Sequence, residues 1–172
     1  DGGIYVLIKG MKKINKAVDT VYMTVSILLL VLLVGASAAQ VFTRYILNNS
    51  LIGTEEIARY CFIWISMLGG SICVGRWAHS TVSILSDALP EIGQKILFVF
   101  INALIIICAY IFISGGIEMF IASGDQLTPT MRIPKCLIYL CVPLGGAGMG
   151  LHSIEHILVT IKELAAKKKG GD

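Results

Sequence analysis

Four long stretches without a charged side chain dominate this 172-residue sequence. They are residues 20–43, 60–75, 96–117 and 136–154, of 24, 16, 22 and 19 residues. A helix of about 20 residues, rising about 1.5 Å per residue, crosses a hydrocarbon core about 30 Å thick. The 16-residue stretch is short, but Arg59 and Arg76 at its ends can extend their side chains to the interfaces. The sequence therefore predicts an all-α integral membrane protein with four transmembrane helices and short loops.

The composition excludes several classes of protein. Hydrophobic residues make up 56% of the chain and charged residues 15%, which is too apolar for an ordinary water-soluble enzyme. The longest connection between spans runs from about residue 76 to 95, which leaves no room for a soluble domain. No basic stripe suited to nucleic acid is present. Any soluble partner must therefore be a separate chain.

The predicted membrane domain covers residues 11–163. Its helices are expected at about 17–45, 55–77, 92–122 and 136–162. Thr54 can cap the second helix, and Pro134 can open the fourth. Residues 1–10, which precede Met11, are interpreted as an upstream extension or a cloning remnant and are left out of the fold. Residues 164–172 are expected to form a basic cytoplasmic tail.

The distribution of positive charge predicts an orientation. With four spans, the two termini and the 76–95 connection share one side of the membrane. That side carries Lys9, Lys12, Lys13, Lys16, Arg76, Lys95, Lys162, Lys167, Lys168 and Lys169, and the other carries Arg44, Arg59, Arg132 and Lys135. The excess predicts that both termini are cytoplasmic. The segment 78–91 is compatible with a short surface helix or with a plain loop.

Small residues recur at four-residue spacing within the spans. The pairs are Gly35 and Ala39, Ser66 and Gly70, Ser71 and Gly75, and Gly146 and Gly150. Such pairs let helices approach closely in lipid, either within this protein or against a membrane partner, and the sequence leaves both readings open. The run Pro143-Leu144-Gly145-Gly146 predicts a kink with a tight packing surface.

One short motif suggests catalysis. The run His152-Ser153-Ile154-Glu155-His156 matches the H-x-x-E-H pattern of a class of zinc proteases. A catalytic zinc needs a third protein ligand, and the run lies at the predicted cytoplasmic interface, where polar residues are usual. We therefore interpret it as interfacial polar packing, with no metal or other cofactor expected.

Two further functions remain alternatives. Five cysteines raise the hypothesis of a four-helix membrane thiol oxidase, although no C-x-x-C pair occurs and Cys136 and Cys141 do not share a helix face. A self-contained small carrier would need an ionisable group near the middle of the membrane. The charges cluster at the helix ends instead, with Gln40 and Asn102 as weak polar candidates.

A series of short motifs runs along the chain. The series has F-x-R-Y ending at Tyr45, T-E-E-I-A-R-Y over 54–60, an apolar helix, and later a basic residue and a His before Leu89-Pro90. This series resembles the small membrane subunit of tripartite ATP-independent periplasmic (TRAP) transporters. One aromatic residue that is often found before T-E-E is replaced here by Gly53. The resemblance covers about residues 12–162.

This resemblance implies a function and partners. It implies a sodium-driven importer of organic acids, such as dicarboxylates or sialic acid, in the bacterial inner membrane. The partners would be a large multi-helix subunit that moves the substrate and couples it to sodium, and a periplasmic substrate-binding protein. This chain would brace the stationary scaffold among membrane lipids. The structural or partner-contact candidates are Arg44, Tyr45, Glu55, Glu56, Arg59, Trp64, Gly69, Gly70, Arg76 and His79.

The charged residues of these motifs are expected to pair. Glu55 and Arg59 are i, i+4 neighbours on one helix. Arg44, at the end of the first helix, is predicted to reach Glu55 or Glu56 at the start of the second. The alternative is a loop of separately solvated charges.

Overall fold

The computed structural model describes residues 2–47, 52–77 and 91–169, and these residues are almost entirely helical. The helices are α1 (Gly2–Tyr45), α2 (Thr54–Trp77), α4 (Glu91–Ser123), α5 (Lys135–Tyr139) and α6 (Cys141–Lys169). Four segments are long and apolar enough to cross a membrane, namely Ile8–Tyr45, Thr54–Arg76, Gly93–Ser123 and Lys135–Lys162. The prediction of four transmembrane helices is confirmed. The segment 78–91, for which a short surface helix and a plain loop were both compatible with the sequence, lies almost wholly outside the described residues.

The first helix begins earlier than predicted. Residues 2–10, which the sequence argument left out, are the first turns of α1, and Ile8 is buried. The prediction started the helix at residue 17 because the charges of Lys12, Lys13 and Lys16 end the apolar stretch there. Charges end a membrane span without ending a helix, and lysine is a good helix former. At the other terminus α6 continues to Lys169, into the predicted tail.

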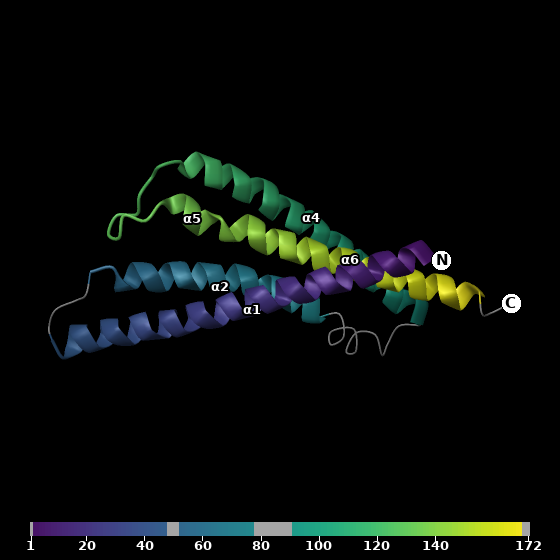
Figure 1. Ribbon diagram of the computed structural model, residues 1–172, viewed down its shortest axis with the longest axis horizontal. Coiled ribbons are helices and arrows are strands. Elements are labelled where there is room, and N and C mark those ends of the chain that lie inside the picture. Colours follow the sequence, from purple (N-terminus) through teal and green to yellow (C-terminus); the bar gives the residue numbers. More distant parts are fainter. Residues whose placement is uncertain (1, 48–51, 78–90, 170–172) are drawn as a thin grey trace.

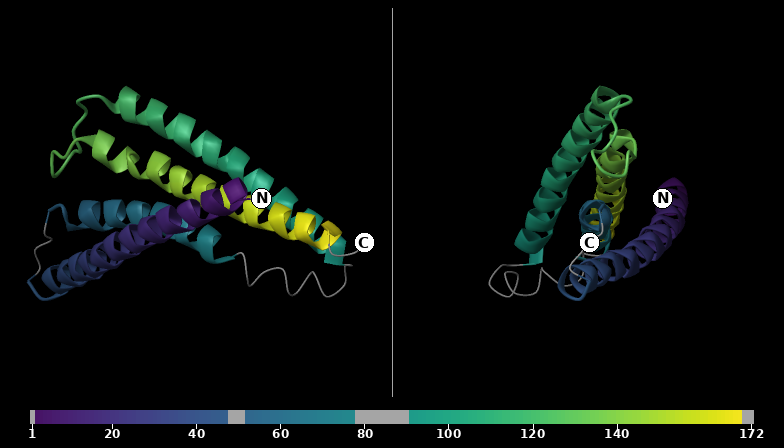
Figure 2. Two further views of the ribbon diagram at one scale, coloured as in Figure 1. Left: turned by 45° about the vertical axis from the view of Figure 1, so that its right-hand side comes forward. Right: turned by 90° about the vertical axis from the view of Figure 1, so that its left-hand side faces the viewer.

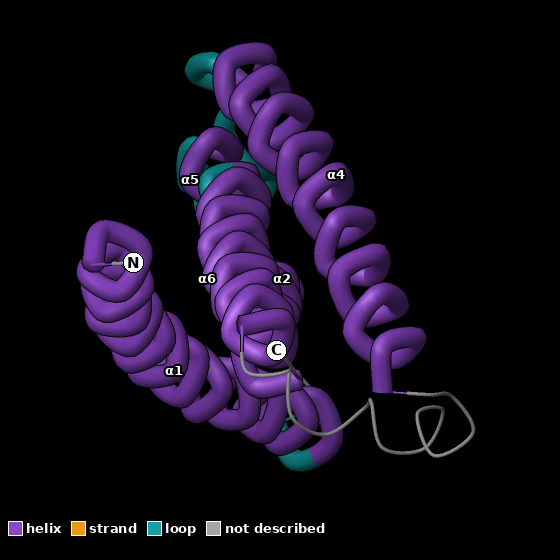
Figure 3. Tube along the Cα trace, turned by 90° about the vertical axis from the view of Figure 1, so that its right-hand side faces the viewer, coloured by secondary structure: helices purple, strands orange, loops and turns teal. Residues whose placement is uncertain are grey.

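The four spans form an open layer rather than a closed bundle. Helix α6 lies between α2 and α4, and α1 packs on the other side of α2 (Figure 1). Seen from the end that carries the termini, α1 and α4 lie on opposite sides of α6 (Figure 3). Among the described residues, α4 contacts neither α1 nor α2. Helix α1 also crosses α6 near the N-terminus (Figure 2). Both termini lie at the same end of the molecule, as four crossings require (Figure 1).

Glycines of α6 allow this helix to approach two neighbours at once. A Cβ atom on Gly145 would lie 2.9 Å from the carbonyl oxygen of Met67 in α2. A Cβ atom on Gly146 would lie 3.0 Å from the carbonyl oxygen of Ala109 in α4. At Gly148 it would collide with the Ser71 hydroxyl and lie 2.7 Å from the Tyr22 ring. These distances leave no room for side chains, so α6 packs backbone to backbone.

The small residues divide into those that pack within this chain and those that remain available to a membrane partner. Gly70, Gly75 and Gly146 face neighbouring helices of this chain, because a Cβ atom on each would lie within 3 Å of another side chain. Gly35 and Gly69 have no atom within 4 Å of that position. The first three therefore serve internal packing, whereas Gly35 and Gly69 lie on surfaces that the described residues leave uncovered.

The fourth span is interrupted at Leu140, between α5 and α6. Pro143 has no N–H group, so the carbonyl of Tyr139, four residues earlier, loses its helical partner. The next bond, from Leu144 N to Leu140 O, is long at 3.4 Å. The kink expected from the Pro143–Gly146 run is therefore present, and it lies one turn before the proline. The Leu144 carbonyl also accepts a hydrogen bond from the Tyr22 hydroxyl at 2.7 Å.

The tight contact at Gly145 generates the first prediction. Gly145→Ala should lower the melting temperature of the purified chain in detergent by several degrees, because overpacking typically costs about 1–3 kcal/mol. Gly69→Ala is the matched control: it has open space and gains helix propensity of about 1 kcal/mol, so its melting temperature should hold or rise. Equal melting temperatures for the two variants would contradict the close contact of α6 with α2.

Candidate functional site

The end of the molecule away from the termini carries the charged residues that begin α2. Arg59 Nη2 lies 3.0 Å from Glu55 Oε1, which confirms the predicted i, i+4 pair. The two side chains are 66% and 71% exposed. An ion pair of this kind contributes about 0.3–0.5 kcal/mol in water. It supports the first turns of α2 but does not join α2 to another element.

Glu56 joins α2 to the loop between α4 and α5. Its carboxylate accepts a hydrogen bond from the Tyr60 hydroxyl at 2.6 Å and one from the backbone N–H of Met131 at 3.0 Å. We call this contact between Glu56 and Met131 the outer clasp. It bridges 75 residues of sequence, so it fixes where the α4–α5 loop lies relative to α2.

The α4–α5 loop is itself a compact turn that presents the Met131 N–H. The backbone N–H of Thr128 donates to Ile133 O at 2.9 Å, and the Ile133 N–H donates to the Thr128 hydroxyl at 3.0 Å. The Thr128 residue is only 2% exposed. Gly53 has a φ of 102°, and a Cβ atom there would lie 3.3 Å from Met131 Cγ. The positive φ and this close approach both favour glycine at position 53.

The predicted contact between Arg44 and the acidic pair is wrong. In the described part of the chain, Arg44 is exposed and forms no ion pair with Glu55 or Glu56. Glu55 pairs with Arg59, and Glu56 is held by Tyr60 and the Met131 N–H. The prediction paired the charges at the two ends of the connection between the first and second helices, and nothing local indicates that a loop 75 residues away supplies the donor to Glu56. Tyr45 beside it is 76% exposed.

The remaining candidate residues lie in different parts of the structure. Trp64 lines an apolar groove of about 470 Å³ between α1, α2 and α5, with Leu32 and Ile138 among its other walls. Gly70 packs internally, and Gly69 does not. Arg76 is exposed and donates to Met23 Sδ at 3.3 Å. His79 lies outside the described residues, as does the Leu89-Pro90 pair.

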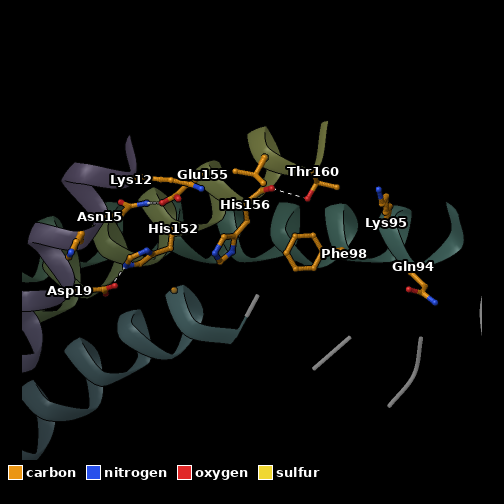
Figure 4. Close-up of a pocket in the computed structure, with 13 residues that line it drawn as sticks. Lys12, Asn15, Asp19, Gln94, Lys95, Phe98, His152, Glu155, His156 and Thr160 are labelled. Atoms are coloured by element: carbon orange, nitrogen blue, oxygen red, sulfur yellow. Dashed lines mark hydrogen bonds and ion pairs between the residues drawn. The ribbon is translucent and has the colours of Figure 1, made fainter. Parts of the chain in front are cut away.

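A second polar cluster lies at the end that carries both termini. His152 is 2% exposed, and its Nε2 lies 3.1 Å from Asp19 Oδ1 (Figure 4). The Asn15 amide donates to Glu155 Oε2 and, at 3.4 Å, to the Leu151 carbonyl. These contacts hold α1 to α6, as the interpretation of the H-x-x-E-H run as polar packing expects. The sequence does not indicate Asn15 and Asp19 as partners, although Asp19 directly precedes the first uncharged stretch and Asn15 lies five residues before it.

Among the described residues, the cysteine side chains form no disulfide. All five cysteines carry free thiols, and Cys141, which is fully buried, donates to the Ile138 carbonyl at 3.1 Å. Within the residues that the structure describes, no group of three or more His, Cys, Asp or Glu side chains is arranged to hold a metal ion.

The outer clasp generates the second prediction. Glu56→Ala should remove the acceptor of the Met131 N–H and loosen the loop around Arg132, which is exposed. Limited trypsin digestion of the chain in detergent should then cleave after Arg132 several-fold faster than in the parent. Glu55→Ala removes the same charge one residue away without touching the loop, and it should leave the cleavage rate unchanged. Equal acceleration in both variants would show that the charge of α2, not the clasp, protects the loop.

Curated relatives of this chain are membrane components of transporters. It is 30% identical over 148 residues to a putative TRAP transporter small permease protein of Haemophilus influenzae, covering 86% of this chain and 89% of that one. It is 32% identical over 134 residues to the sialic acid TRAP transporter permease protein SiaT of the same species, covering 78% of this chain and 21% of that one. It is 25% identical over 164 residues to the ectoine TRAP transporter small permease protein TeaB of Halomonas elongata, covering 92% and 83%.

These relatives are transport components and not enzymes, so the thiol-oxidase and metalloprotease hypotheses are set aside. The family model for the DctQ component of tripartite ATP-independent periplasmic transporters matches residues 33–163, which include α2, α4, α5 and the outer clasp. The match extends over most of the layer of spans and agrees with the similarity to complete small permease proteins. The chain therefore belongs to the DctQ family, the small membrane subunits of TRAP transporters.

Proposed function

We propose that this chain is the stationary scaffold subunit of a sodium-coupled importer of organic acids in the bacterial inner membrane. Its partners are a large multi-helix subunit, which carries the substrate and the sodium sites, and a periplasmic substrate-binding protein. The observation that carries the proposal is the position of the ionisable groups: the described clusters lie at the two ends of the layer, around Glu56 and around His152. A hydrated anion needs fixed polar or charged groups to replace its water, and the central stretches supply no charged side chain and only isolated polar ones such as Gln40 and Asn102.

The open layer supports a bracing role. The most apolar part of α1 has no buried residue, and bulky side chains such as Leu28 and Val31 are 65% and 67% exposed. On α4, at the other edge, Tyr110 and Ile111 are 71% and 58% exposed. A layer with two uncovered edges and two broad faces offers surfaces that a larger membrane protein can pack against.

The relatives support a large membrane subunit as the partner. They also support a substrate site that lies in the other components. This chain matches about a fifth of the longer permease SiaT, so in that protein a similar segment belongs to a much larger chain. The relatives carry the names of different substrates, sialic acid and ectoine. A shared small subunit with different substrates is expected when the substrate site lies in the other components.

The orientation follows from charge. Ten Lys and Arg residues flank the spans at the end with the termini and four at the other end. We therefore place both termini in the cytoplasm and the outer clasp in the periplasm, where it faces the binding protein. Reporter fusions after Lys169 should give cytoplasmic signals and an insertion at Asp125 a periplasmic one. A periplasmic signal from the C-terminal fusion would reverse the orientation.

Reconstitution tests the function. The purified chain alone, in liposomes with an inward sodium gradient, should take up no labelled organic acid, because its membrane core has no site for one. The chain together with its large subunit and loaded binding protein should give sodium-dependent uptake. Omitting this chain should abolish or strongly reduce that uptake. Uptake by the lone chain would establish the self-contained carrier instead, and full uptake without it would refute the scaffold role.

The His152 cluster supplies a control for that experiment. Replacing His152 and His156 together by Gln should leave uptake by the complete complex largely intact, because the cluster packs α1 against α6 and is far from any proposed substrate path. The double variant should be checked for yield and melting temperature beside the parent. Loss of uptake at normal yield, restored by added zinc, would instead assign the histidines to a metal site.

A further inference from the structure

A pocket of about 570 Å³ opens at the end of the molecule that carries both termini (Figure 4). Its lining includes His156 and Val159 from α6, Lys12 and Lys16 from α1, and Phe98 from α4. Helices α1 and α4 do not contact each other, so the pocket lies between the two edges of the layer. Nothing in the scaffold role requires a pocket at this place.

The pocket lies at the depth of the lipid headgroups. Lys16 precedes the first uncharged stretch by four residues, Lys95 directly precedes the third, and Glu155 directly follows the fourth. All three residues line the pocket. Ends of apolar stretches mark the boundary between hydrocarbon and headgroups, so the pocket lies where phosphate groups of the leaflet are found.

The charges of the pocket favour an anion. Three ammonium groups, on Lys12, Lys16 and Lys95, face two carboxylates, on Asp19 and Glu155. Glu155 accepts a hydrogen bond from Asn15, and Asp19 Oδ1 lies 3.1 Å from His152 Nε2. With three positive and two negative side chains the lining has one net positive charge, and Lys12 and Lys16 are exposed one helical turn apart on α1.

The base of the pocket is polar and fixed. Asn15 and His152 are 4% and 2% exposed, and both line the pocket. His152 Nε2 has no hydrogen-bond partner among the described residues, although Asp19 is at ion-pair distance. The His156 and Phe98 rings lie 5.9 Å apart and form the apolar wall next to this polar base. A polar base, a cationic rim and an apolar wall match the phosphate and glycerol of a phospholipid.

We propose that this pocket binds the phosphate group of an anionic glycerophospholipid from the adjoining leaflet. Lys12 and Lys16 hold the phosphate oxygens by charge-assisted hydrogen bonds, and Phe98 and Val159 contact the glycerol and the first acyl carbons. A zwitterionic headgroup is disfavoured because its own cation would enter a pocket that is already positive. The bound lipid would fill the space between the edges of the layer at this end.

Native mass spectrometry of the full chain, titrated with phosphatidylglycerol or phosphatidylcholine in detergent, tests the proposal. The parent should retain phosphatidylglycerol at least about tenfold more tightly. Lys12→Gln with Lys16→Gln should weaken that retention about thirtyfold, since each lysine at a membrane surface accounts for about a fivefold change. The control, Lys9→Gln with Lys13→Gln, removes the same charge at the same spacing from exposed positions of α1 outside the pocket, and should stay within about threefold of the parent.

Each other outcome overturns the proposal. If the parent has no preference for the anionic lipid, the pocket does not select it. If the two double variants weaken lipid retention equally, general surface charge accounts for the effect. Displacement of the lipid by inorganic phosphate or glycerol phosphate at the same concentration would assign the pocket to a soluble phosphate instead. If Lys12→Gln with Lys16→Gln binds lipid normally but no longer co-purifies with the large subunit, the pocket is a protein contact. Circular dichroism of both variants confirms that each is folded.

Discussion

The close approach of α6 to α2 and α4 is the contact on which the rest of the structure depends. Lipid is as apolar as leucine, so burying leucine between helices in a membrane gains little, and helices associate through van der Waals contact at short range. Gly145 and Gly146 put the backbone of α6 against backbone carbonyls on both sides. The layer forms because α6 carries glycine on two faces. Among the described residues α1 and α4 do not touch each other, so their relative position is set by α2 and α6 between them.

The spans could be predicted from the sequence, but the contacts between their ends could not. Four apolar stretches, the kink before Pro143 and the Glu55–Arg59 pair depend on residues within a few turns of each other. The donor to Glu56 is a backbone N–H 75 residues away, and the partners of His152 and Glu155 are more than 130 residues away on α1. The residue types alone indicate that these polar groups need partners. They do not indicate which partners, and the partners predicted for Arg44 were wrong.

The two polar clusters complement the glycine contacts. The outer clasp fixes the α4–α5 loop on α2, and the Asn15 and His152 contacts fix α1 on α6 at the opposite end. Between them the spans meet mainly through apolar and small side chains, and the hydrogen bond from Tyr22 to the Leu144 carbonyl is a further directional contact of α1 with α6. Directional hydrogen bonds at both ends, together with this one, therefore define the register of the layer.

The length of α1 makes the protein responsive to the thickness of its membrane. Its uncharged stretch of 24 residues is about 36 Å long, which exceeds a hydrocarbon core of about 30 Å. The helix lies at the edge of the layer and is tied to α6 at the end that carries the termini, so it accommodates the excess by tilting, by roughly 35° if it stays straight. A thinner bilayer increases that angle and a thicker one reduces it. Because α1 packs along α2, the tilt of these two helices is thus set in part by the lipid in which the protein lies.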